Sequence, residues 1–131
     1  MRIRDHVRAA TAHEHVRGFA DAPEDAKAYG AVCNKLPILV HTAGLTAALH
    51  FVAGRKASQR RLLAHLAQQL HDAGLLEDDS AEGLLAATRV AELAELQALT
   101  LEAQRCLLWY KRFVKSVLKI DETEEGGAEH A

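Results

Sequence analysis

Residues 100–120 read TLEAQRCLLWYKRFVKSVLKI and decide the fold class. The stretch contains neither Gly nor Pro, so nothing in it interrupts a helix. Its apolar residues recur at steps of three and four, which places them on one face of an α-helix. They are Ala103, Cys106, Leu107, Tyr110, Phe113, Val114, Val117 and Leu118. The pattern predicts a helix whose apolar face packs against other helices.

The same stretch carries a basic stripe beside its apolar face. Lys111, Lys115 and Lys119 follow one another at steps of four, with Arg105 and Arg112 just beyond them. We expect this stripe to meet a polyanion or a partner subunit, and we expect Trp109 to lie at the edge of the core.

The rest of the chain predicts further helices and no strand. At 131 residues it is long enough for one domain with one core. The most apolar helix should begin at Pro37, end at Gly54 and be central, while Thr100 should cap the last helix. Together the patterns predict an all-α bundle of six or seven helices, covering residues 3–19, 24–35, 37–54, 58–73, 81–87, 89–98 and 100–120.

Charge divides the chain into a basic body and an acidic end. The chain contains 16 Lys and Arg and 18 Asp and Glu, which gives a net charge of −2. Residues 121–131 contain five of these carboxylates and no Lys or Arg, so the body has an excess of three positive charges. This division predicts a helical domain over 1–120 and a solvated, disordered tail over 121–131. The alternative is that the tail competes with an anionic ligand for the basic stripe.

Neither a membrane segment nor a secretory signal is expected. No apolar run approaches the ~20 residues of a membrane helix, and the N-terminus is charged. Cys33 and Cys106 each fall within an apolar helical pattern, which is typical of buried free thiols, and their spacing fits no metal motif. We therefore expect a cytoplasmic protein with no bound metal or cofactor.

Two basic clusters are candidate nucleic-acid contacts. Lys and Arg side chains on one surface can neutralise phosphates without reading sequence. A charged stripe is equally typical of an ordinary solvated helix face. The sequence does not choose between the two clusters, which are Arg55, Lys56, Arg60 and Arg61 in one and Lys111, Arg112, Lys115 and Lys119 in the other.

Two histidines offer an enzymatic alternative. Arg8 with His13, and Arg60 with His65, fit the Arg-x4-His spacing of the helical HEPN ribonucleases. A histidine there would act as acid or base near neutral pH. About two such matches are expected by accident in a chain with so many Arg and His, so we favour a protein with no catalytic residues.

Two segments together resemble a known family. Residues 29–52, YGAVCNKLPILVHTAGLTAALHFV, and residues 108–113, LWYKRF, resemble the small helical subunit of the type III-B CRISPR–Cas complex, also called the Cmr or RAMP-module complex. The matching features include Tyr29, the Lys-Leu-Pro step at 35–37 and Trp109 followed by Lys-Arg-Phe. The resemblance spans roughly residues 24 to 120.

This resemblance implies a non-enzymatic structural role in antiviral defense. In such complexes several copies of the small subunit stack beside the backbone subunit that carries the guide RNA. They line the channel in which target RNA pairs with the guide, while the nuclease centres belong to other subunits. The implied partners are other Cmr subunits, copies of the chain itself, and target RNA with guide RNA, and we expect Leu108 at an interface. A small subunit of another CRISPR effector is the remaining alternative.

Overall fold

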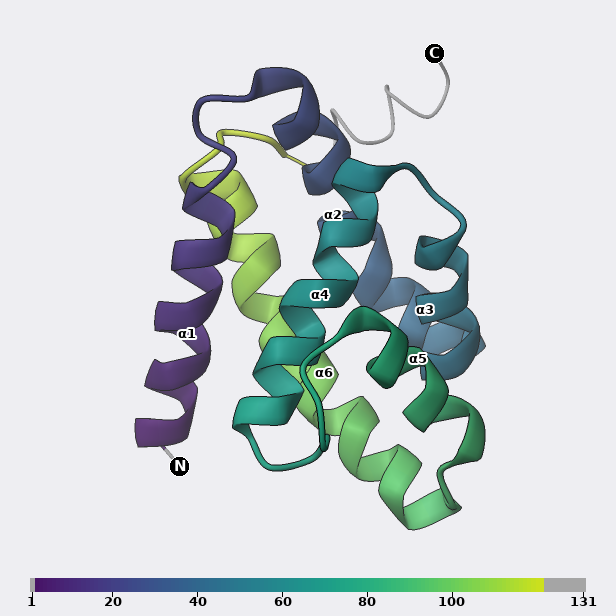
Figure 1. The fold of residues 1–131 in the computed structure, drawn as a ribbon. Helices are drawn as coiled ribbons and strands as arrows, with labels where there is room; N and C mark the ends of the chain where they lie inside the picture. The colour runs from purple at the N-terminus through teal and green to yellow at the C-terminus, as the bar shows by residue number, and fades with distance from the viewer. Residues whose placement is uncertain (1, 122–131) are drawn as a thin grey trace.

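The structure is a computed structural model that describes residues 2–121 (Figure 1). Over these residues the chain forms no strand and six helices, α1 (Arg2–Arg17), α2 (Pro23–Ala43), α3 (Leu45–Ala53), α4 (Ala57–Asp72), α5 (Ala81–Val90) and α6 (Leu93–Ser116). The predicted all-α bundle is therefore confirmed. None of these helices is long and apolar enough to cross a bilayer. The predicted acidic tail lies outside the described residues, except for Asp121.

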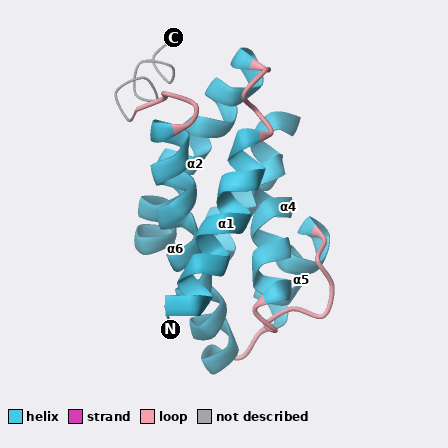
Figure 2. Cartoon of the chain, turned by 90° about the vertical axis from the view of Figure 1, so that its left-hand side faces the viewer, coloured by secondary structure: helices cyan, strands magenta, loops and turns pink. Residues whose placement is uncertain are grey.

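Three of the other helices pack around α6. It contacts α1, α2 and α4, and α2 and α4 also contact each other. Figure 1 shows α1 on one side of the bundle and α3 with α5 on the other, and Figure 2 shows α1 between α6 and α4. The core side of α6 is the predicted one, with Ala103, Cys106, Leu107, Tyr110 and Val114 buried.

The helix boundary predicted at Pro37 is wrong, because α2 continues through this residue. Leu36 and Val40 on either side are buried, and the carbonyl of Pro37 accepts a hydrogen bond from Nε2 of Gln104 in α6 (3.2 Å). Packing against α6 thus offsets the backbone hydrogen bond that a proline removes. The chain turns instead at Gly44, whose φ of 91° is readily adopted only by glycine.

The last helix begins earlier than predicted. It starts at Leu93, where the side chain of Glu95 accepts a hydrogen bond from the backbone N–H of Glu92 (3.3 Å) and so caps the first turn. Thr100 is not a cap; its hydroxyl donates to the carbonyl of Leu96 (2.7 Å) within the helix. The helix predicted over 89–98 is absorbed into α5 and α6, which is why the described chain has six helices.

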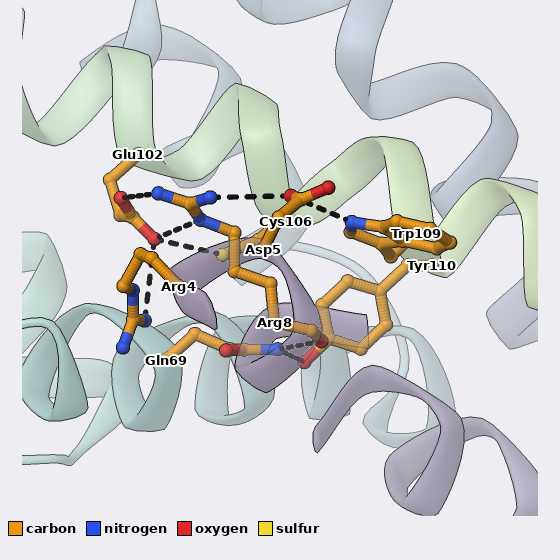
Figure 3. A network of polar contacts seen from close by, with 8 residues as sticks. All are labelled: Arg4, Asp5, Arg8, Gln69, Glu102, Cys106, Trp109 and Tyr110. Atoms are coloured by element: carbon orange, nitrogen blue, oxygen red, sulfur yellow. Dashed lines mark hydrogen bonds and ion pairs between the residues drawn. The ribbon is translucent and has the colours of Figure 1, made fainter. Parts of the chain in front are cut away.

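A polar network attaches α1 to α6 (Figure 3). Nε and Nη2 of Arg8 donate to the two carboxylate oxygens of Glu102 at 2.7 and 2.8 Å, and both side chains are buried. Arg4 approaches the same carboxylate at 3.5 Å. Asp5 accepts from Arg8 (3.2 Å) and from the indole N–H of Trp109 (3.0 Å), which leaves Trp109 at the edge of the core as predicted. The hydrogen bond from Arg8 holds the pKa of Glu102 below its ordinary value.

Candidate nucleic-acid interface

The structure divides the first predicted basic cluster. Arg55 and Lys56, at the turn between α3 and α4, line a groove beside α2. Arg60 folds back, with its guanidinium donating to the backbone carbonyl of Arg55 (2.6 Å). Arg61 lies over the ring of Phe19, with its guanidinium carbon 4.8 Å from the ring centre. Only two of the four predicted residues therefore line this groove.

The groove beside α2 concentrates positive charge around an exposed aromatic ring. We call it the Phe51 groove; its volume is about 210 Å³. Phe51 belongs to the apolar segment from Pro37 to Gly54 that was predicted to form a central helix, but its side chain is 40% exposed. Four cations face one carboxylate, since the charged residues that line the groove are Lys27, Lys35, Arg55, Lys56 and Glu24.

Two of these cations lie against the ring of Phe51. Nζ of Lys35 is 5.6 Å from the ring centre and the guanidinium carbon of Arg55 is 5.5 Å from it. Both distances are those of cation–π contacts. Nε of Arg55 also donates to Gln59 (3.2 Å), and Gln59 in turn donates to the carbonyl of Ala28 in α2 (3.1 Å). These contacts keep the two charges at the wall of the groove.

Sequence reasoning missed three contributors to this groove. Lys27 and Lys35 lie eight residues apart, so a helical wheel places them on one face of α2. The sequence alone could therefore have grouped these two lysines. Nothing in the local sequence showed that this face lies beside the α3–α4 turn, or that Phe51 is exposed there. The tertiary packing of α2 against α3 and α4 decides both.

Most of the second predicted cluster lines another groove, between α2 and α6. We call it the α2–α6 groove; its volume is about 450 Å³, and its lining consists of Asn34, Leu108, Lys111, Arg112, Lys115, Ile120 and Asp121. Lys119 is exposed beyond the end of α6 and does not line the groove. The members of the two predicted basic clusters that line a groove therefore do so in two separate grooves, and α2 contributes to both.

Leu108 lies at the surface, as a subunit contact requires. Its side chain is 53% exposed, and Ile38 of α2 and Leu101 of α6 are also more than half exposed. Its place at an interface stays a prediction.

The histidine pairs do not form an accessible acid–base site in this structure. His65 is 9% exposed, is hydrogen-bonded to the hydroxyl of Tyr29 (2.7 Å) and stacks on His15 with ring centres 3.9 Å apart. Burial, with the nearby charges of His15 and Arg61, lowers the pKa of His65 to about 3, so its ring is neutral at pH 7. His13 is exposed, but its partner in the motif, Arg8, is held in the buried ion pair with Glu102.

Comparisons with known proteins identify the family. The family described as CRISPR-associated protein (Cas_Cmr5) matches residues 4–117. The "CRISPR system Cmr subunit Cmr5" of Thermus thermophilus is 38% identical over 120 residues, which cover 91% of this chain and 99% of that protein. The crystal structure of a CRISPR-associated Cmr5 family protein from Thermus thermophilus is similar with a TM-score of 0.78 and 37% identity, and the match covers 87% of this chain and 96% of that one.

These matches and the all-α bundle place the chain among the CRISPR-associated proteins. Within that class it belongs to the Cmr5 family. The resemblance seen in residues 29–52 and 108–113 is confirmed.

Proposed function

We propose that this protein is the non-catalytic small subunit of a type III-B CRISPR–Cas effector that targets RNA in the cytoplasm as part of antiviral defense. Its Cmr5 family membership supports this role over that of another CRISPR effector, since its relative is described as a Cmr subunit. Several copies stack beside the subunit that carries the guide RNA, and each copy helps hold the target RNA. The partners are the other Cmr subunits, further copies of the chain, and target RNA with guide RNA.

The Phe51 groove is the observation that carries the RNA contact. Four cations around one cavity suit phosphate groups, and neutralising phosphates requires no base-specific geometry. The exposed ring of Phe51 adds an aromatic surface on which any base can stack. A subunit that meets a different target with every guide needs contacts of this kind, which do not depend on sequence.

Two substitutions test the groove by measuring the affinity of the full-length protein for single-stranded RNA over a range of salt concentrations. Lys56→Ala should weaken binding and make the salt dependence shallower by about 0.7 in the log–log slope, the value of one phosphate contact on a single strand. Phe51→Ala should weaken binding by about 1–3 kcal/mol with little change in slope, because it removes stacking and leaves the charges.

Arg105→Ala is the matched control, because Arg105 is also an exposed cation but lies on α6 outside both grooves. It should leave affinity and slope close to those of the wild type. If Lys56→Ala and Arg105→Ala behave alike, the Phe51 groove is not the RNA contact. Charge reversal at Lys111, Arg112 and Lys115 then tests the rival stripe on α6.

A role without catalysis is supported by the histidines. A buried, neutral His65 and a His13 whose partner Arg8 is engaged elsewhere offer no pair that could exchange protons with RNA. Incubation of the protein with single-stranded RNA checks this proposal, and cleavage that disappears in His13→Ala or His65→Ala would contradict it.

A further inference from the structure

We propose that the α2–α6 groove is the docking site of the chain's own C-terminal segment, residues 122–131. The segment would neutralise the basic stripe of α6 and leave the Phe51 groove open. This inference goes beyond the proposed function and does not require either groove to bind RNA.

The groove has the chemistry of a carboxylate site. Lys111, Arg112 and Lys115 bring three cations to it from two turns of α6. Asn34 of α2, which is only 4% exposed, also lines it, and none of the described residues offers its Nδ2 a hydrogen-bond acceptor. A buried amide donor without an acceptor costs free energy, which a carboxylate oxygen entering the groove would recover. A carboxylate suits this arrangement, because its two oxygens can accept hydrogen bonds from the cations and from the amide of Asn34 at the same time.

The C-terminal segment supplies such groups in the right place. Residues 122–131 read ETEEGGAEHA, with four carboxylates and no Lys or Arg. The segment follows directly from Asp121, which itself lines the groove. Because one residue spans at most ~3.6 Å, Glu122, Glu124 and Glu125 all lie within reach of it. Attachment at the rim also gives the segment a local concentration on the order of millimolar, far above that of a separate ligand.

With the acidic segment docked, the two grooves differ in how readily an outside anion can bind in them. Any anion that binds Lys111, Arg112 or Lys115 must first displace the acidic segment, whereas the Phe51 groove is lined by a single carboxylate, Glu24. The contact should weaken as salt rises, because it is electrostatic and near the surface.

Nuclear magnetic resonance of the full-length protein without RNA tests the docking. The variant replaces Glu122, Glu124, Glu125 and Glu129 by Gln, which removes the charges and keeps the length. The side-chain amide resonances of Asn34 and the methyl resonances of Leu108 should shift relative to the wild type. Salt at about 1 M, where the Debye length is about 3 Å, should move the wild-type resonances toward those of the variant.

The matched control neutralises four exposed carboxylates elsewhere, Asp21, Glu77, Asp79 and Glu82, and so changes the net charge equally. Its Asn34 and Leu108 resonances should stay at their wild-type positions. Wild-type shifts that depend on protein concentration would assign the groove to the tail of a second copy and overturn docking within one chain. If the Glu→Gln variant matches the wild type while an oligonucleotide shifts the same resonances, the groove is a nucleic-acid site and the proposal is wrong.

Discussion

α1 and α2 both pack against α6, but they are held to it by different chemistry. α2 approaches so closely that a Cβ at Gly30 would lie 3.0 Å from a methyl carbon of Val114, and the surrounding residues are apolar. α1 is attached through the buried ion pair of Arg8 with Glu102. Apolar contacts do not depend on protonation, whereas a buried ion pair is strong only while both partners are present and charged. The difference predicts that α1 is the part of the bundle most sensitive to charge and pH.

The largest expected effect comes from removing one partner of the ion pair. Arg8→Met should lower the free energy of unfolding by about 3 to 5 kcal/mol, because the buried carboxylate of Glu102 keeps only the more distant charge of Arg4 among the described cations. The double variant with Glu102→Met should recover much of this loss, since two apolar side chains of similar size can replace a buried pair. Urea denaturation of the single and double variants measures both. If the double variant is no more stable than Arg8→Met, the unpaired charge of Glu102 is not the cause of the lost stability.

A smaller effect is expected from pH. The ring of His15 stacks on that of His65, and Nδ1 of His15 is hydrogen-bonded to the hydroxyl of Tyr110 (2.7 Å). Burial lowers the pKa of both histidines, that of His65 to about 3, so the unfolded chain binds protons that the folded protein excludes. Stability should therefore be constant above pH 6.5 and fall below it, by roughly 2 kcal/mol at pH 5 for His65 alone.

His65→Gln provides the check on this pH dependence. Glutamine keeps a hydrogen-bond acceptor for Tyr29 but does not titrate, so the loss of stability between pH 7.5 and 5 should become smaller. His41→Gln is the matched control, because His41 is exposed and its removal leaves the buried pair intact. Thermal or urea unfolding across this range measures the slope. If the free energy of unfolding depends on pH equally in the wild type and in His65→Gln, the stacked histidines are not the cause of the pH dependence.

The smallest effect is expected at an exposed position of α6 that lies outside the core. Leu108→Ala should change the free energy of unfolding by less than about 0.5 kcal/mol, because the side chain is 53% exposed. Its neighbour Leu107 is fully buried, and Leu107→Ala should cost about 2–5 kcal/mol. Urea denaturation compares the two. Loss of assembly by a stable Leu108→Ala would mark this side of α6 as a subunit contact.

The helical class and the core side of α6 could be predicted because both depend on local periodicity. The stripe from Ala103 to Val114 repeats at helical spacing, and a helix buries such a stripe whatever its neighbours are. The boundaries at Pro37 and Thr100 could not be predicted in the same way. Proline locally favours the first turn of a helix. At Pro37 this preference is outweighed by the burial of Leu36 and Val40 and by the hydrogen bond from Gln104.

The candidate site also has features that the sequence predicts and features that depend on tertiary packing. Arg55, Lys56 and the stripe on α6 could be found from the sequence, because clustered charge is visible in one dimension. Their separation into two grooves could not, since it depends on how α2 packs between its neighbours, with Lys27 and Lys35 lining one groove and Asn34 the other.

The sequence by itself determined the fold class, the apolar face of α6 and the family, because each rests on residue types at fixed spacing. The tertiary structure alone decided that Phe51 is exposed among cations, that Asn34 lies buried in a basic groove and that Arg8 meets Glu102. These contacts join residues up to 94 positions apart, and no local periodicity encodes which helices will be neighbours.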